Sequence, residues 1–128
     1  MNIELYALLA TALLLLALAF ISSALYGKQV GNPALMGNRE QIAAPTGAAR
    51  RAIRAHLNLI ENALPFAMVV LAAQAQHVST PLTRAAALVF IAARLLHALS
   101  YIAGITKIRT LLWLTGVGAT FAIALAML

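Results

Sequence analysis

The sequence predicts an all-α integral membrane protein that forms a four-helix transmembrane bundle. Of its 128 residues, 63% are hydrophobic and 9% are charged, and the mean hydropathy is +0.93. A soluble globular domain carries about 25% charged residues, so this composition excludes one. A helix needs about 20 apolar residues to cross a bilayer core, so four crossings occupy nearly the whole length and make residues 1–128 a single domain. The spans are expected to be helical, because an open sheet leaves backbone groups unpaired in lipid.

Four apolar stretches alternate with turn-forming segments. The first covers residues 3–26, and its only charge is Glu4. A cleaved signal peptide begins with basic residues, so the acidic start disfavours one. A polar connection rich in Gly, Pro and Asn follows over residues 27–51. Short joints make the neighbouring helices antiparallel, and Ser79 or Thr80 is expected to cap the third span. The other three spans are predicted at residues 52–74, 82–103 and 110–127.

The basic residues indicate how the bundle lies in the membrane. By the positive-inside rule, the first and third connections face the cytoplasm and both termini face the opposite side, where Arg84 is the one Lys or Arg. This asymmetry and contacts with anionic lipid headgroups account for the net charge of +6, so no nucleic-acid partner is expected. We expect a bacterial inner membrane. The cytoplasmic basic residues are Lys28, Arg39, Arg50, Arg51, Lys107 and Arg109.

Charged residues also occur inside the predicted spans, where each costs about 2.5–3.5 kcal/mol and therefore needs a reason to persist. Glu61 lies seven residues from Arg54, about 10.5 Å along one helix, so we expect it to pair with Arg94 on the antiparallel third span. Polar side chains recur every three or four residues, which places them on one face of each helix. The stripes comprise Arg51, Arg54, Asn58, Glu61 and Pro65, then Arg94, His97 and Tyr101, then Arg109 and Trp113.

These stripes converge on the cytoplasmic half of the bundle and predict a cavity for an anionic or zwitterionic ligand. Structural roles are the alternatives: an ion pair that fixes helix register, an interhelical hydrogen bond from Asn58, terminal arginines that reach the phosphates, or aromatic residues at the membrane interface. Metal binding is not expected, because the chain has no cysteine and His56 and His97 have few companions.

The same residues resemble the signature of the MAPEG family, the membrane-associated proteins in eicosanoid and glutathione metabolism. The resemblance covers essentially the whole chain and is most similar to the microsomal glutathione transferase branch. The leucine at position 57 differs from the arginine of the prostaglandin synthase branch, so prostaglandin synthesis is disfavoured. The matching segments are Asn32-Pro33, Arg54-Ala55-His56-Leu57-Asn58, Glu61-Asn62, Pro65-Phe66, Ala93-Arg94-Leu95-Leu96-His97, Tyr101 and Arg109.

The resemblance implies a homotrimer of four-helix subunits, with glutathione bound between neighbouring subunits and lipophilic co-substrates arriving from the bilayer. Arg109 stands where the family stabilises the glutathione thiolate, which would attack an electrophile or reduce a lipid hydroperoxide. The residues that would hold the tripeptide are Arg54, His56, Asn58, Glu61, Arg94 and Tyr101, to which the polar stripes add Arg51 and His97.

Three positions depart from the transferase pattern. Ile53 and Ala24 stand where relatives have arginines, and Leu59 stands where an aspartate is usual. Part of the positive charge that would bind the glutathione carboxylates is therefore missing. The alternatives to a glutathione transferase or peroxidase are a non-catalytic protein of the same fold that binds a lipid or a membrane protein, and a small proton-coupled exporter.

Overall fold

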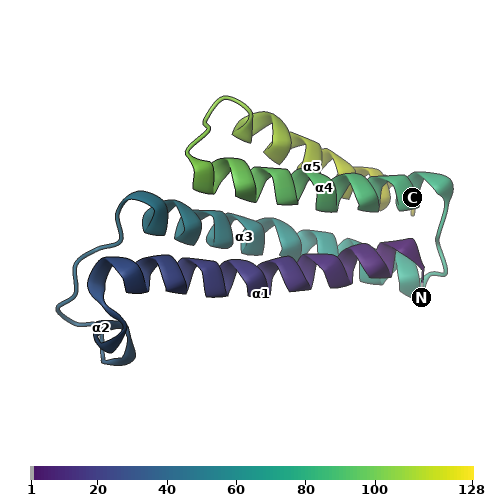
Figure 1. The fold of residues 1–128 in the computed structure, drawn as a ribbon. Helices are drawn as coiled ribbons and strands as arrows, with labels where there is room; N and C mark the ends of the chain where they lie inside the picture. Colours follow the sequence, from purple (N-terminus) through teal and green to yellow (C-terminus); the bar gives the residue numbers. More distant parts are fainter. Residues whose placement is uncertain (1) are drawn as a thin grey trace.

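The computed structural model describes residues 2–128, which form four long helices and one short one (Figure 1). Both termini lie at one end of the bundle, and the connections before α3 and before α5 lie at the other end. This arrangement agrees with antiparallel neighbours and with basic connections on a shared side. The helices are α1 (Ile3–Val30), α2 (Asn32–Met36), α3 (Gly47–Ala75), α4 (Pro81–Ala103) and α5 (Arg109–Leu125).

Helices α1, α3 and α4 are long and apolar enough to cross a membrane, while α5 is apolar but has 17 residues. Three of the predicted spans thus correspond to span-capable helices. A helix of this shorter length rises about 25 Å, close to the hydrocarbon thickness, so the fourth crossing stays a prediction.

The helix ends extend beyond the predicted spans. Helix α1 continues to Val30 and α3 already begins at Gly47, so the connection between them is shorter than residues 27–51. Hydropathy marks the lipid-embedded part of a helix, whereas its backbone hydrogen bonds continue into the polar interface. The turn-forming pair Asn32-Pro33 opens the short α2, since a proline is pre-organised for the first turn of a helix.

Local capping fixes the start and end of α4. Thr80 accepts a hydrogen bond from the backbone N–H of Thr83 and forms a capping box with it, and Pro81 occupies the first turn. The expectation that Ser79 or Thr80 caps this helix is therefore confirmed for Thr80. At the other end, Gly104 adopts the left-handed conformation (φ 81°), which glycine accepts without a steric penalty.

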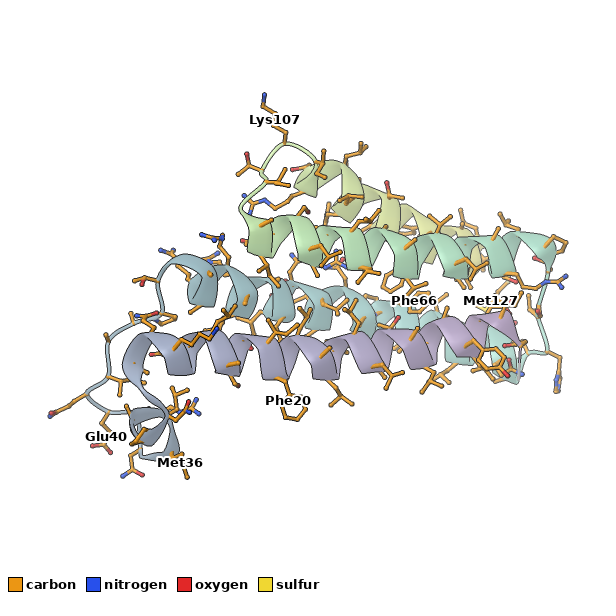
Figure 2. The ribbon with its side chains drawn as sticks, viewed as in Figure 1. Phe20, Met36, Glu40, Phe66, Lys107 and Met127 are labelled. Carbon is orange, nitrogen blue, oxygen red and sulfur yellow. The ribbon has the colours of Figure 1, made fainter. Side chains whose placement is uncertain are left out.

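The core consists mainly of alanine and phenylalanine. Helix α1 packs chiefly on α3, and α4 packs on α5. The rings of Phe66 and Phe90 stack between α3 and α4 with centroids 3.7 Å apart, and small residues allow the helices to approach closely around them. Phe20 instead points outward from α1, 76% exposed, as expected for a surface in contact with lipid (Figure 2). The alanines in the same buried cluster as the Phe66 and Phe90 rings are Ala7, Ala73, Ala86, Ala87 and Ala119.

A buried polar cluster joins the starts of α1 and α4 at the end of the bundle that carries the termini. The carboxylate of Glu4 is 2% exposed and accepts hydrogen bonds from the hydroxyls of Thr83 (2.6 Å) and Ser79 (3.0 Å). Beside it, the amide of Asn2 donates to the side-chain oxygen of Gln74 (2.6 Å). The only charge of the first span is therefore held by hydroxyl donors from α4 and from the connection before it.

Candidate functional site

Two adjacent cavities open at the end of the bundle opposite the termini, among the first half of α3, the end of α4 and the start of α5. Asn58 and Tyr101 line both cavities and so form the boundary between them. The first cavity, about 510 Å³, is also lined by Ala44, Pro45, Arg50, Ile53, Arg54, Leu57 and Glu61. The second, about 330 Å³, is also lined by His97, Thr106, Arg109, Thr110 and Trp113.

The structure brings together most of the residues that the sequence singles out. The residues of each polar stripe share one face of their helix. Because α3 and α4 are antiparallel, both stripes lie near the same end of the bundle. The predicted residues that line a cavity are Arg54, Asn58, Glu61, His97, Tyr101, Arg109 and Trp113.

Arg94 contacts Asn58 at the boundary between the cavities and is completely buried. Its Nη2 donates a 2.5 Å hydrogen bond to Oδ1 of Asn58, while its Nε and Nη1 have no hydrogen-bond partner among the described residues. The expected pair with Glu61 is therefore wrong within the single chain. Glu61 is exposed and faces the first cavity. Asn58, almost one turn earlier on α3, occupies the position facing Arg94.

An aromatic ring supports the cation of the second cavity. The guanidinium carbon of Arg109 lies 4.2 Å from the ring centroid of Tyr101, a cation–π geometry that fixes the charge at the cavity wall. The ring of His97 lies 5.7 Å from that of Tyr101 and is 3% exposed. Its Nδ1 has no partner in residues 2–128. The second cavity therefore combines a half-buried guanidinium with an imidazole.

Two predicted residues lie elsewhere. Arg51 donates from Nε to the backbone oxygen of Ile102 (2.9 Å), so it ties the start of α3 to the end of α4 and lines neither cavity. A cation beside the terminal carbonyls of a helix also complements the helix dipole. His56 is half-buried on α3 and lines neither cavity.

Sequence reasoning missed Arg50 as a cavity residue. Arg50 precedes Arg54 by four residues and Arg51 precedes it by three, and both spacings fit one helical face. Because α3 starts at Gly47, Arg50 belongs to its first turn, where it faces the cavity. The apolar wall formed by Ala44 and Pro45 carries no signal in the sequence, since it depends on the path of the connection.

The charge distribution suits an elongated zwitterion. Arg50 and Arg54 supply two cations to the first cavity, and Glu61 supplies an anion further along α3. Arg109 supplies a separate cation to the second cavity. No group of three or more His, Cys, Asp or Glu side chains arranged to hold a metal ion occurs in residues 2–128.

Comparison with known proteins identifies the family of the chain. No curated protein matches the chain. The model of the MAPEG family matches residues 3–128, which include every helix and all residues of both cavities. The chain therefore belongs to the MAPEG family, and it is a membrane protein of eicosanoid and glutathione metabolism.

Proposed function

We propose that this protein is a membrane-bound glutathione transferase or peroxidase, which binds glutathione across the two cavities and activates its thiol as the thiolate. One observation carries the proposal. Arg109, held over Tyr101, lines the second cavity, which shares Asn58 and Tyr101 with the first cavity and its two arginines and carboxylate.

The functional groups of glutathione match these side chains. The tripeptide has two carboxylates, one ammonium group and one thiol. Arg50 and Arg54 provide charge-assisted hydrogen bonds for the carboxylates, and Glu61 accepts from the ammonium group. With these groups in the first cavity, the thiol extends past Asn58 toward Arg109.

The cation at Arg109 supplies the chemistry. A free thiol has a pKa of about 8.5 and is mostly protonated at neutral pH, whereas a guanidinium stays charged and favours the thiolate. In a transfer reaction, the thiolate forms a carbon–sulfur bond with a lipophilic electrophile as the leaving group departs with its electron pair. In a peroxidase reaction, it attacks the hydroperoxide and forms a sulfenic acid and an alcohol. A second glutathione then yields the disulfide and water.

The proposal includes the membrane setting. We place the cavities on the cytoplasmic side of a bacterial inner membrane, in a homotrimer whose lipophilic co-substrates arrive from the bilayer. The positive-inside distribution supports this orientation. Within the described chain, Nε and Nη1 of buried Arg94 have no hydrogen-bond partner. Buried polar groups are normally hydrogen-bonded, which supports partners from a ligand or a neighbouring subunit.

A second candidate is a non-catalytic member of the family that binds a lipid or a membrane protein. Ile53, an apolar residue, lines the first cavity where the transferase branch has an arginine, and this favours a less polar ligand. The two candidates differ in whether the purified protein binds glutathione.

Calorimetric titration of the protein in detergent with glutathione tests the proposal. We expect saturable binding that weakens at least about tenfold in Arg54→Gln, because one charged hydrogen bond contributes about 1.5–3 kcal/mol. Arg84→Gln, which changes an exposed arginine at the opposite end of the bundle, is the matched control. Wild-type protein that does not bind glutathione would overturn the proposal and favour the non-catalytic candidate.

A further inference from the structure

The connection between α2 and α3 forms one wall of the first cavity. Ala44 and Pro45 line that cavity opposite the arginines of α3. Neither residue carries a charge, so this wall affects the shape of the cavity and adds no charge to it. Its position relative to Arg50 and Arg54 therefore decides how closely the cavity surrounds a ligand.

Two side chains near the end of α1 hold this wall in place. The hydroxyl of Tyr26 donates to the backbone oxygen of Ala43 (2.5 Å). The amide of Gln29 donates to the backbone oxygen of Ala44 (2.8 Å), and its oxygen accepts from the backbone N–H of Thr46 (2.9 Å). Three hydrogen bonds with side chains of α1 thus fix Ala43, Ala44 and Thr46, on either side of Pro45.

Gln29 also fixes the first turn of α3. Thr46 is the N-cap of α3, but its side chain makes no capping hydrogen bond. Its backbone N–H is instead bound by Gln29, and its backbone oxygen accepts from the N–H of Arg50 (3.2 Å). The same glutamine therefore holds the wall and the start of the helix that carries the cavity arginines.

We propose that Tyr26 and Gln29 are positioning residues for glutathione, which set the width of the first cavity without touching the reacting sulfur. This inference rests on the proposed function. The connection contributes no residue to the lining of the second cavity, where Arg109 lies. Loss of the hydrogen bonds should therefore weaken binding of the tripeptide and leave thiolate formation in the bound state unchanged.

The test compares Tyr26→Phe, Gln29→Leu and the double variant with the wild-type protein. Gln41→Leu is the matched control, because Gln41 is an exposed glutamine of the same connection that makes no side-chain hydrogen bond within residues 2–128. The measurements are the glutathione Kd, the KM and kcat of conjugation, and hydrogen exchange of the Thr46 amide, whose N–H is bound by Gln29. We expect faster exchange of the Thr46 amide in Gln29→Leu and in the double variant, and a Kd and KM about 3–10 times higher for each single variant, which corresponds to one or two ordinary hydrogen bonds. The kcat should stay within about twofold, and Gln41→Leu should match the wild type.

The outcomes separate this inference from the proposed function. Unchanged exchange of the Thr46 amide in Gln29→Leu would show that Gln29 does not hold the connection, and would overturn the inference alone. Faster exchange with unchanged KM, or a lower kcat at unchanged KM, would also overturn it while glutathione transfer stands. Wild-type protein without affinity for glutathione would overturn both.

Discussion

The guanidinium of Arg94 on α4 donates a 2.5 Å hydrogen bond to Oδ1 of Asn58 on α3, and Asn58 belongs to both cavities. A fully buried cation is thus linked to the ligand site by one amide. Burying a charge is costly unless it is hydrogen-bonded, so the amide stabilises both the helix pair and the boundary between the cavities.

Removal of that amide should destabilise the protein. We expect Asn58→Ala to lower the free energy of unfolding by about 1–3 kcal/mol, because Nη2 of Arg94 loses its partner in the interior. Thermal unfolding in detergent measures this. Asn62→Ala is the control, since Asn62 only donates back to Asn58 on its own helix. Equal stability of the two variants would contradict the role given to the Arg94 bond.

Two glycines of α5 should respond differently to alanine. A Cβ at position 116 would lie 3.2 Å from Cδ of Arg94, whereas one at position 118 would meet no atom within 4 Å. Gly118→Ala should therefore stabilise α5 by about 0.5–1 kcal/mol through helix propensity, because position 118 is exposed. Gly116→Ala should lower stability by about 1–2 kcal/mol, because it pushes on a buried side chain that cannot easily move. Similar melting temperatures for the two variants would show that the Arg94 environment is loosely packed.

The buried carboxylate of Glu4 should contribute to stability, far from the candidate site. In Glu4→Ala, the hydroxyls of Thr83 and Ser79 lose their shared acceptor, and we expect a loss of about 1–3 kcal/mol with an unchanged affinity for glutathione. Glu40→Ala, at an exposed position of the connection, should leave stability within about 0.5 kcal/mol. Denaturation midpoints and titration calorimetry give both quantities. A Glu4→Ala protein as stable as Glu40→Ala would contradict the buried cluster.

Glu61 should act on binding and leave folding intact. A buried ion pair with Arg94 would make Glu61→Gln strongly destabilising, but the carboxylate is exposed at the first cavity. We expect a change in stability within about 0.5 kcal/mol, and a glutathione Kd at least about tenfold higher through loss of the contact with the ammonium group. A large loss of stability together with unchanged binding would restore the ion-pair interpretation.

Hydropathy and helical spacing predict most of the architecture. Apolar stretches locate the long helices, the threonine before Pro81 caps α4, and spacing of three or four residues brings Asn58, Tyr101 and Arg109 to one end. These features depend on local chemistry or on the period of a single helix, which the sequence contains directly.

The remaining features depend on how helices pack against one another. Each residue turns a helix by about 100°, so Arg50 and Arg51 both fit a polar stripe, and only the position of α4 decides which of them reaches the cavity. The choice of Asn58 over Glu61 as the partner of Arg94 has the same origin. The wall formed by the connection depends on long-range hydrogen bonds from α1, which no local pattern predicts.

The central claim is that Arg109 stabilises the thiolate of bound glutathione. Its most direct test is the ultraviolet difference spectrum of the protein in detergent, titrated with glutathione near neutral pH, for the wild type and for Arg109→Ala. We predict a saturable thiolate absorbance in the wild type that is lost in the variant, with assembly unchanged because Arg109 lies at the start of α5. Equal thiolate absorbance in the two proteins would contradict the claim.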